Sequence, residues 1–296
     1  MFFLVGGDSE IGGQTFCALK SAGAAVEATT RRLDRHAIPG RSHLDLAGDL
    51  SGWVPPPAVS SACIFAAVAR LAACAADPVG SFHVNVTQTL SLIDRLLEQG
   101  AHVVFLSTNQ VFDGEIPHVA PDAATHPISE YGRQKAQTEA ALQAKLGQGA
   151  PLAILRLAKV VSPEMSLIHN WIANLSVGRP VKAFTDMMMA PIPIELVAKA
   201  IIALMRDRAI GVFQLSGPTD VSYLDVAYYI ARQVGAVPGL VKPEMAADAG
   251  QPLGATPRHT TLDSAMMLGR YGIAVPEPWS VVDSIVAARQ QAPPRA

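Results

Sequence analysis

Residues 2–12 read FFLVGGDSEIG, so a short apolar run passes directly into a glycine turn. The run FFLV is typical of a buried parallel strand, and the following stretch, with Phe16 and Leu19 before Gly23, predicts a helix. A turn in this place lets the backbone approach a pyrophosphate, which the free N–H groups of the helix amino terminus also attract. The candidate cofactor-binding residues here are Gly6, Asp8, Ser9, Glu10, Ile11 and Gly12. Ser9 stands where a middle glycine is usual, so an ordinary strand-to-helix turn remains the alternative.

The second predicted strand covers residues 25–30 and ends at Arg31 and Arg32. Nucleotide-binding sheets that prefer NAD place an acidic residue at this point for the ribose hydroxyls, whereas arginine accommodates the 2'-phosphate of NADP. The two arginines therefore favour NADP over NAD. Two solvated arginines on a loop are the alternative reading.

Two further strands are predicted before the middle of the chain. Residues 43–46 suggest a short third strand, and residues 62–68 a fourth strand whose small terminal residues allow a cofactor to come close, or simply pack. A helix with an apolar stripe follows, and Asn85 near its start is expected to order water or backbone near the site. The cofactor-binding candidates from this part are Asp45, Leu46, Ala66, Ala67, Val68 and Asn85.

The stretch from Val103 to Lys135 carries the candidate chemistry. An apolar run ends in Ser107 and Thr108, which a parallel strand would deliver to a ligand crevice. After a proline-rich loop, a predicted helix opens with Tyr131 and places Lys135 four residues later on the same face. A nearby cation favours the phenolate of a tyrosine, whose free pKa is about 10, so the pair can serve as a proton donor. The same spacing also occurs on many solvated helix surfaces.

Composition excludes several classes of protein. The chain is 50% hydrophobic and has a formal net charge of −2, which supports a substantial core and does not indicate a nucleic-acid surface. We expect neither a signal peptide nor a membrane span, and therefore a cytoplasmic protein. Cys17, Cys63 and Cys74 lack metal or redox spacing and the histidines are scattered, so we expect no metal site.

The combined order of motifs resembles the extended short-chain dehydrogenase/reductases, most closely the dTDP-4-dehydrorhamnose reductase branch. The resemblance covers nearly the whole chain. It rests on the amino-terminal turn, Ser107-Thr108 with Val111-Phe112-Asp113-Gly114 after it, Tyr131-Gly132-x-x-Lys135, Arg156, Pro257-Arg258 and Leu262-Asp263. It implies a nicotinamide cofactor, a catalytic trio of Thr108, Tyr131 and Lys135, and protonation of the substrate oxygen by Tyr131. Lys135 would also bind the nicotinamide ribose, and Ser107 and Tyr131 are further cofactor-binding candidates.

The expected fold is α/β, a Rossmann-type doubly wound parallel sheet with a smaller α/β substrate-binding lobe. Residues 1–160 would form the NADP-binding domain and residues 161–296 mainly the lobe, with about 190–218 interleaving back into the first domain. Helices are expected over residues 168–177, 194–205 and 222–234, and a strand over 211–216. Met187, Met188 and Met189 either line an adaptable apolar pocket or fill the core.

The chain departs from this branch on the expected substrate side. Where the reductases usually read Ser-Thr-Asp-Tyr, this chain has Asn109 and Gln110 in the last two places, and Lys159 replaces an aromatic residue. These three residues and Arg258, a candidate diphosphate contact, are the predicted substrate residues.

We therefore expect an NADP-dependent reductase that acts on a carbonyl of a nucleotide-activated sugar or a related small ketone. The alternatives are a sugar-nucleotide epimerase or dehydratase and a non-catalytic NADP-binding regulatory subunit. The oligomeric state stays open, with a homodimer as one option.

Overall fold

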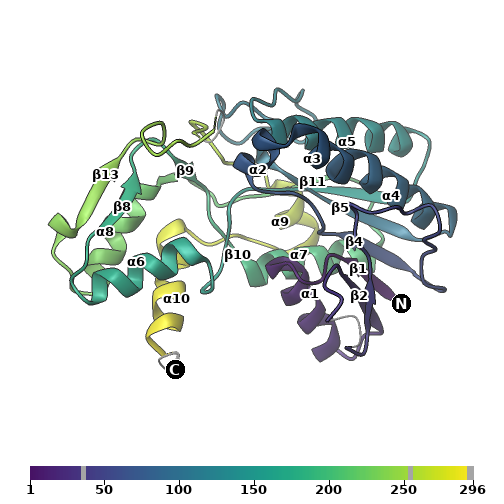
Figure 1. The fold of residues 1–296 in the computed structure, drawn as a ribbon, viewed down its shortest axis with the longest axis horizontal. Helices are drawn as coiled ribbons and strands as arrows, with labels where there is room; N and C mark the ends of the chain where they lie inside the picture. Colours follow the sequence, from purple (N-terminus) through teal and green to yellow (C-terminus); the bar gives the residue numbers. More distant parts are fainter. Residues whose placement is uncertain (35–37, 253–255, 292–296) are drawn as a thin grey trace.

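A seven-stranded parallel sheet forms the centre of the larger domain (Figure 1). The computed structural model describes residues 1–34, 38–252 and 256–291. The strand order is β11-β6-β5-β4-β1-β2-β3. The strands are β1 (Phe2–Val5), β2 (Val26–Thr30), β3 (Arg41–His43), β4 (Ser61–Ile64), β5 (His102–Thr108), β6 (Leu152–Leu157) and β11 (Gly211–Leu215).

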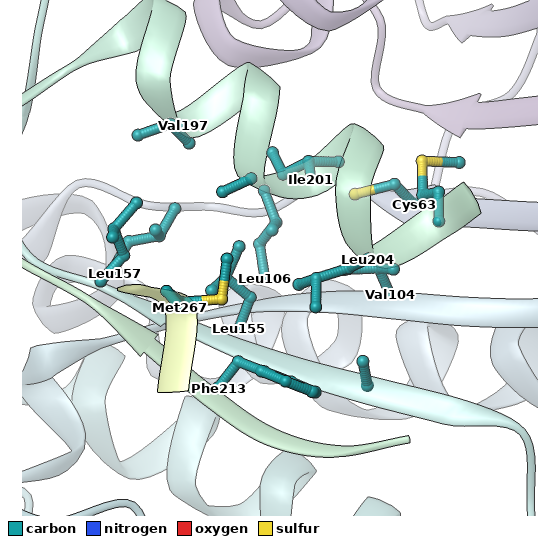
Figure 2. Close-up of a cluster of buried hydrophobic side chains, with 14 of the residues drawn as sticks. Cys63, Val104, Leu106, Leu155, Leu157, Val197, Ile201, Leu204, Phe213 and Met267 are labelled. Atoms are coloured by element: carbon teal, nitrogen blue, oxygen red, sulfur yellow. The ribbon is translucent and has the colours of Figure 1, made fainter. Parts of the chain in front are cut away.

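Helices cover both faces of this sheet, so every residue of β4, β5 and β6 is buried. One face packs against α1 (Glu10–Ser21), α7 (Ile194–Asp207) and α9 (Ala265–Tyr271). In Figure 2, Val197, Ile201 and Leu204 of α7 lie against strand residues of this face. The other face packs against α4 (Thr89–Glu98) and α5 (Glu130–Gly147). Between β4 and α4 the chain forms α2 (Leu71–Ala76), α3 (Pro78–Phe82) and the π-helical turn η1 (His83–Gln88).

The strand order fixes where a ligand can bind. The chain builds β1, β2 and β3 toward one edge, then crosses over β1 to place β4, β5 and β6 toward the other. In open parallel sheets the carboxyl ends of the strands diverge at such a reversal and leave a crevice for ligands. The expected Rossmann-type fold is confirmed, and the crevice lies above β1 and β4.

The smaller lobe lies at one end of the sheet (Figure 1). Its helices α6 (Ser166–Ser176), α8 (Tyr223–Gln233) and α10 (Pro278–Gln291) share a core with strands from three short pairs, while Ile192 of one pair belongs to the core of the larger domain. The pairs are β7 (Val160–Val161) with β10 (Ile192–Pro193), β8 (Val181–Phe184) with β13 (Val241–Glu244), and β9 (Met188–Met189) with β12 (Val221–Ser222). The 3-10 turns are η2 (Asn109–Val111) and η3 (Pro238–Leu240). The helices and strand expected after residue 160 agree with α6, α7, β11 and α8 to within two residues. The division at residue 160 stays a prediction, although α7 and β11 do belong to the central sheet layers.

Two predicted strands end earlier than expected. The third strand is β3 and not residues 43–46, because the last ladder bond runs from Leu44 N to Thr30 O and Asp45 then turns the chain by accepting from Ala47 N. The fourth ends at Ile64, beyond which two successive backbone N–H groups share the carbonyl of Val5. Both strands therefore stop where the crevice opens.

None of the helices among the described residues combines the length and the apolar character that a membrane crossing requires.

Candidate active site

The last two residues of β5 bring hydroxyl groups to the carboxyl edge of the sheet. Ser107 and Thr108 are both buried, and β6 runs alongside with Leu157 opposite Thr108. Thr108 caps the turn η2, because its Oγ1 accepts a hydrogen bond of 3.2 Å from Gln110 N. Ser107 Oγ is buried and lacks a hydrogen-bond partner among the described residues. The strand end is therefore polar, as the sequence predicts.

Tyr131 lies in the first turn of α5, beside this strand end. Ser129 caps the helix, with Gly132 N donating to Ser129 Oγ at 3.0 Å. A β-carbon on Gly132 would lie 2.1 Å from the carbonyl oxygen of Gln110, so only glycine lets the helix approach η2 this closely. Tyr131 and Thr108 consequently line the same pocket of about 290 Å³, which we call the reaction pocket.

Lys135 lies behind Tyr131 on the same face of α5. Its Nζ donates to the carbonyl oxygen of Leu106 at 2.8 Å and lies 4.4 Å from the ring centroid of Phe105 and 5.9 Å from that of Tyr131. Burial lowers the pKa of Lys135 to about 8, although the carboxylate of Glu139 opposes this shift. The predicted pairing of phenol and ammonium is therefore present, through the ring of the tyrosine.

The pKa of Tyr131 moves in the direction opposite to the one expected. Burial raises it above the usual value, and the neighbouring Cys74 thiol adds to the rise. The ammonium of Lys135 does not reverse this shift, because Nζ is bound to a backbone carbonyl rather than to the phenol oxygen. The phenol is consequently protonated at neutral pH.

A buried ion pair supports α5 one turn beyond Lys135. Arg156 of β6 donates to Glu139 through Nη2 at 2.6 Å and through Nε at 3.0 Å, and both side chains are buried. Nη1 of Arg156 reaches the carbonyl of Pro121 at 2.9 Å and Gln214 Oε1 at 3.1 Å, while the guanidinium lies 4.9 Å from the ring centroid of Phe112. Sequence reasoning overlooked Glu139, whose spacing of four residues from Lys135 was the available signal.

Asn85 connects α5 to the segment after β4. Its side-chain amide exchanges two hydrogen bonds with the backbone of Val68, at 2.8 and 3.0 Å, and donates to Gln134 Oε1 at 2.7 Å. Gln134 in turn donates to Ser81 Oγ at 2.8 Å. Asn85 thus orders the backbone of Val68, while its contact with the cofactor stays a prediction. Gln134 was not anticipated.

A second cavity, of about 360 Å³, lies over the switch in strand order, and we call it the nucleotide cavity. Of the predicted cofactor residues it is lined by Gly6, Asp8, Ser9, Arg31, Arg32, Asp45, Leu46, Ala66, Ala67 and Val68. Gly6 has a φ of +91°, and a β-carbon there would lie 2.7 Å from Ala66 N. Ser9 has an extended backbone and caps α1 by accepting from Gly12 N at 3.1 Å. The hydroxyl of Ser9, at the place where a middle glycine is usual, therefore stabilises the start of α1.

The charged residues of the nucleotide cavity have mixed signs. Arg31 and Arg32 are exposed and line the cavity. The carboxylate of Asp8 accepts a hydrogen bond from the Thr30 hydroxyl and lies 3.7 Å from Nη1 of Arg41. The carboxylate of Asp8 therefore already interacts with Thr30 and Arg41 of the protein itself.

Not every predicted residue lines a cavity wall. Glu10 Oε1 accepts from Ser162 Oγ at 2.9 Å, so this side chain points toward the lobe, and Ile11 packs against the core. Arg258 does not line the reaction pocket, because its side chain is 75% exposed and lies 3.9 Å from Glu115. Its role as a diphosphate contact stays a prediction without support from this geometry.

The other three predicted substrate residues, Asn109, Gln110 and Lys159, line the reaction pocket. All three places where the sequence departs from the reductase pattern therefore meet in one cavity. Two of the changes, to Asn109 and to Lys159, make this cavity more positive.

The lobe completes the reaction pocket with Met187, Met188 and Tyr223, whereas Met189 is buried in the core of the lobe. Met187 and Met188 therefore line a pocket and Met189 fills the core, so each of the two expectations for the methionines applies to different positions. Tyr223 was missed, because an aromatic residue at the start of a predicted helix carries no distinguishing signal.

Known proteins resemble this chain in sequence and in fold. A dTDP-4-keto-6-deoxy-D-glucose reductase of Streptomyces niveus is 31% identical over 148 residues, which are 49% of this chain and 51% of that protein. The match therefore spans about half the length of that relative. A dTDP-4-dehydrorhamnose reductase of Sinorhizobium fredii is 26% identical over 210 residues, 64% of this chain and 67% of that protein.

The solved dTDP-4-dehydrorhamnose reductase of Bacillus anthracis, in complex with NADP, superposes with a TM-score of 0.80 at 15% identity and covers 97% of this chain and 98% of its own. The model of the family described as RmlD substrate binding domain matches residues 2–290. The chain belongs to this family, and its resemblance to the dTDP-4-dehydrorhamnose reductase branch is confirmed.

Proposed function

We propose that this protein is an NADP-dependent reductase of a carbonyl on a nucleotide-activated sugar or a related small ketone, with Tyr131 as the general acid. The observation that supports this most strongly is that Thr108 and Tyr131 line the reaction pocket together, with Lys135 buried behind the ring of Tyr131. The nucleotide cavity lies next to this pocket, since Val68 lines the nucleotide cavity and the following residue, Ala69, lines the reaction pocket. The dTDP-sugar reductases among the relatives support the substrate class.

The nucleotide cavity fits a nicotinamide dinucleotide. The close approach of Gly6 to Ala66 leaves a bare backbone at the amino terminus of α1, where a pyrophosphate is favoured by free N–H groups. Arg31 and Arg32 suit the 2'-phosphate of NADP. The cofactor, when bound, supplies the hydride.

The residues of the chain would handle the oxygen and the proton. Thr108 Oγ1 and the Tyr131 hydroxyl hold the substrate carbonyl oxygen in the reaction pocket. Tyr131 donates its proton to this oxygen as the hydride reaches the carbon, which yields an alcohol and a phenolate. The ammonium of Lys135 offsets the negative charge left on the tyrosine.

The closest rival is an epimerase or dehydratase, which begins by oxidising its substrate and needs the phenolate of Tyr131 as a base. The dTDP-sugar reductases among the relatives favour reduction over this rival.

Replacing Tyr131 by Phe tests the assignment, because the change removes one hydroxyl and keeps the ring. Reduction, followed by the loss of NADPH absorbance, should fall about a hundredfold or more. NADPH binding should be unchanged and serves as the control. Unchanged turnover would reject Tyr131 as the acid. Tight NADPH binding by the unaltered protein without turnover on any carbonyl substrate would favour a regulatory subunit.

Cofactor choice is tested by comparing NADPH with NADH. A charge-assisted hydrogen bond contributes about 1.5 to 3 kcal/mol, which predicts a preference of about tenfold to a hundredfold for NADPH. Changing both Arg31 and Arg32 to Ala should remove most of it. Equal affinities of the unaltered protein for NADPH and NADH would show that Arg31 and Arg32, beside Asp8, do not select the 2'-phosphate.

The substrate class is tested by thermal unfolding in the presence of dTDP, UDP and GDP sugars. A ligand selective for the folded state raises its stability by mass action. A clear shift with NADPH but with no sugar nucleotide would point to a small ketone.

A further inference from the structure

The reaction pocket carries a cation that the proposed mechanism does not use. The side chain of Lys159 is exposed. Among the described residues that line this pocket, Lys159 is the only charged one, and there is no Asp or Glu. Over the described part of the chain, Lys159 forms no ion pair. The remaining polar lining is neutral, so the wall has a net positive charge.

The backbone holds this lysine in a fixed place beside the reacting groups. Lys159 lies two residues beyond Leu157, which is opposite Thr108 in the sheet. Its carbonyl accepts from Ile192 N at 2.9 Å, and the preceding Ala158 N donates to Leu215 O at 3.1 Å. Both neighbouring segments therefore anchor the lysine, while its side chain is free to meet a ligand.

A carboxylate that contacts the pocket lining, that of Asp220, is already engaged. Asp220 accepts from Thr260 N at 2.8 Å and from Thr260 Oγ1 at 2.6 Å, and its other oxygen faces His259 Nδ1 at 3.3 Å. These contacts fix Thr260 in the lining and occupy the Asp220 carboxylate. The ammonium of Lys159 is thus available to an incoming anion.

We propose that Lys159 binds a carboxylate carried by the sugar ring that is reduced, so that the preferred substrate is a nucleotide-activated keto-sugar acid rather than a neutral deoxy sugar. This inference rests on the proposed function. The anion belongs to the ring because Lys159 shares its pocket with Thr108 and Tyr131, which receive the reacting oxygen. The substrate diphosphate is the other source of an anion, and the experiment separates the two.

UDP-glucuronic acid and UDP-glucose are a matched pair of probes, because they differ only in a carboxylate against a hydroxymethyl group. Their affinities for the NADPH complex are measured by calorimetry. The unaltered protein should bind the acid about tenfold to a hundredfold more tightly. Lys159→Met should bring the two affinities together by weakening the acid alone, and Lys159→Arg should keep the preference. Lys242→Met removes an exposed lysine of β13 away from the pocket and should change neither affinity.

Equal binding of both probes by the unaltered protein would overturn the proposal. An equal loss for both probes in Lys159→Met would also overturn it, since a diphosphate contact serves both alike. Failure of the proposed function has a different signature, in which neither nucleotide sugar binds. Free glucuronic acid and glucose then replace the pair on the same variants, and a preference for the acid that Lys159→Met does not remove rejects the role of Lys159.

Discussion

Breaking the buried pair of Arg156 and Glu139 should destabilise this chain far more than breaking a surface pair of the same length. Its closest N–O distance is 2.6 Å, the same as between Lys182 and Glu244, where the lysine side chain is 72% exposed. The perturbation is Glu139→Gln, with Glu244→Gln as the matched control. Both changes remove one carboxylate charge and keep the shape of the side chain.

The expected magnitudes follow from burial. Glu139 accepts three contacts from Arg156, at 2.6, 3.0 and 3.1 Å, and water does not reach either group. Its loss leaves a buried guanidinium without a counter-charge, which destabilises the fold by about 3 to 5 kcal/mol. The exposed pair is screened by solvent, so Glu244→Gln should cost about 1 kcal/mol or less.

Urea unfolding at neutral pH measures both changes. Trp53 stacks on Phe3 of β1 at 6.3 Å, so its fluorescence reports on the sheet that contains Arg156. Replacing both Arg156 and Glu139 by Met should recover much of the loss, because no buried charge is then left unpaired. If Glu139→Gln lowers the free energy of unfolding no more than Glu244→Gln does, the assigned role of burial is wrong.

Three other predictions concern the site and the sheet. Gly132→Ala should destabilise the protein by about 1 to 3 kcal/mol, because the added β-carbon would meet the carbonyl oxygen of Gln110. Gly147→Ala in the same helix places its β-carbon in open space and should stabilise the protein by up to about 1 kcal/mol. The midpoints of urea unfolding compare the two variants. Burial lowers the pKa of His102, so protonation of the unfolded chain should reduce stability as pH falls below about 6.5. The melting temperature of His102→Gln should depend less on pH over that range, and an unchanged slope would contradict this. The cation of Lys135 is lost as pH rises through about 8, so kcat/KM for reduction should fall there, and a plateau to about pH 10 would argue against its role.

Local signals were enough to predict the elements that carry the site. The apolar run before Gly6 gave β1, and the run before Ser107 gave β5, because strands buried on both faces need continuous apolar sequence. Ser9 at the middle glycine place weakened the prediction of a nucleotide turn. The structure removes the conflict, since this residue has extended backbone and serves as a helix cap.

The sequence could not reveal groups whose partners are distant in the chain. Gln214 is a site residue only because β11 pairs with β6, which brings it to Arg156. Tyr223 and Met187 line the reaction pocket because the lobe meets the larger domain there, next to Thr108 and Tyr131. No local periodicity encodes such contacts. The ends of β3 and β4 were overestimated for a related reason, since hydrogen bonding to β1 and β2 sets them rather than apolar composition.

The pKa of Tyr131 could not be predicted from spacing, because two opposing effects decide it. The four-residue spacing to Lys135 predicts proximity, and the structure shows it, but proximity alone would lower the pKa of the phenol. Burial acts on both groups toward their neutral forms, raising the pKa of Tyr131 and lowering that of Lys135. The proton is therefore held on the phenol until a ligand oxygen develops negative charge beside it. The same burial that limits ionisation at rest strengthens the attraction between Lys135 and the phenolate that forms, so the pair is suited to giving up a proton during the reaction rather than before it.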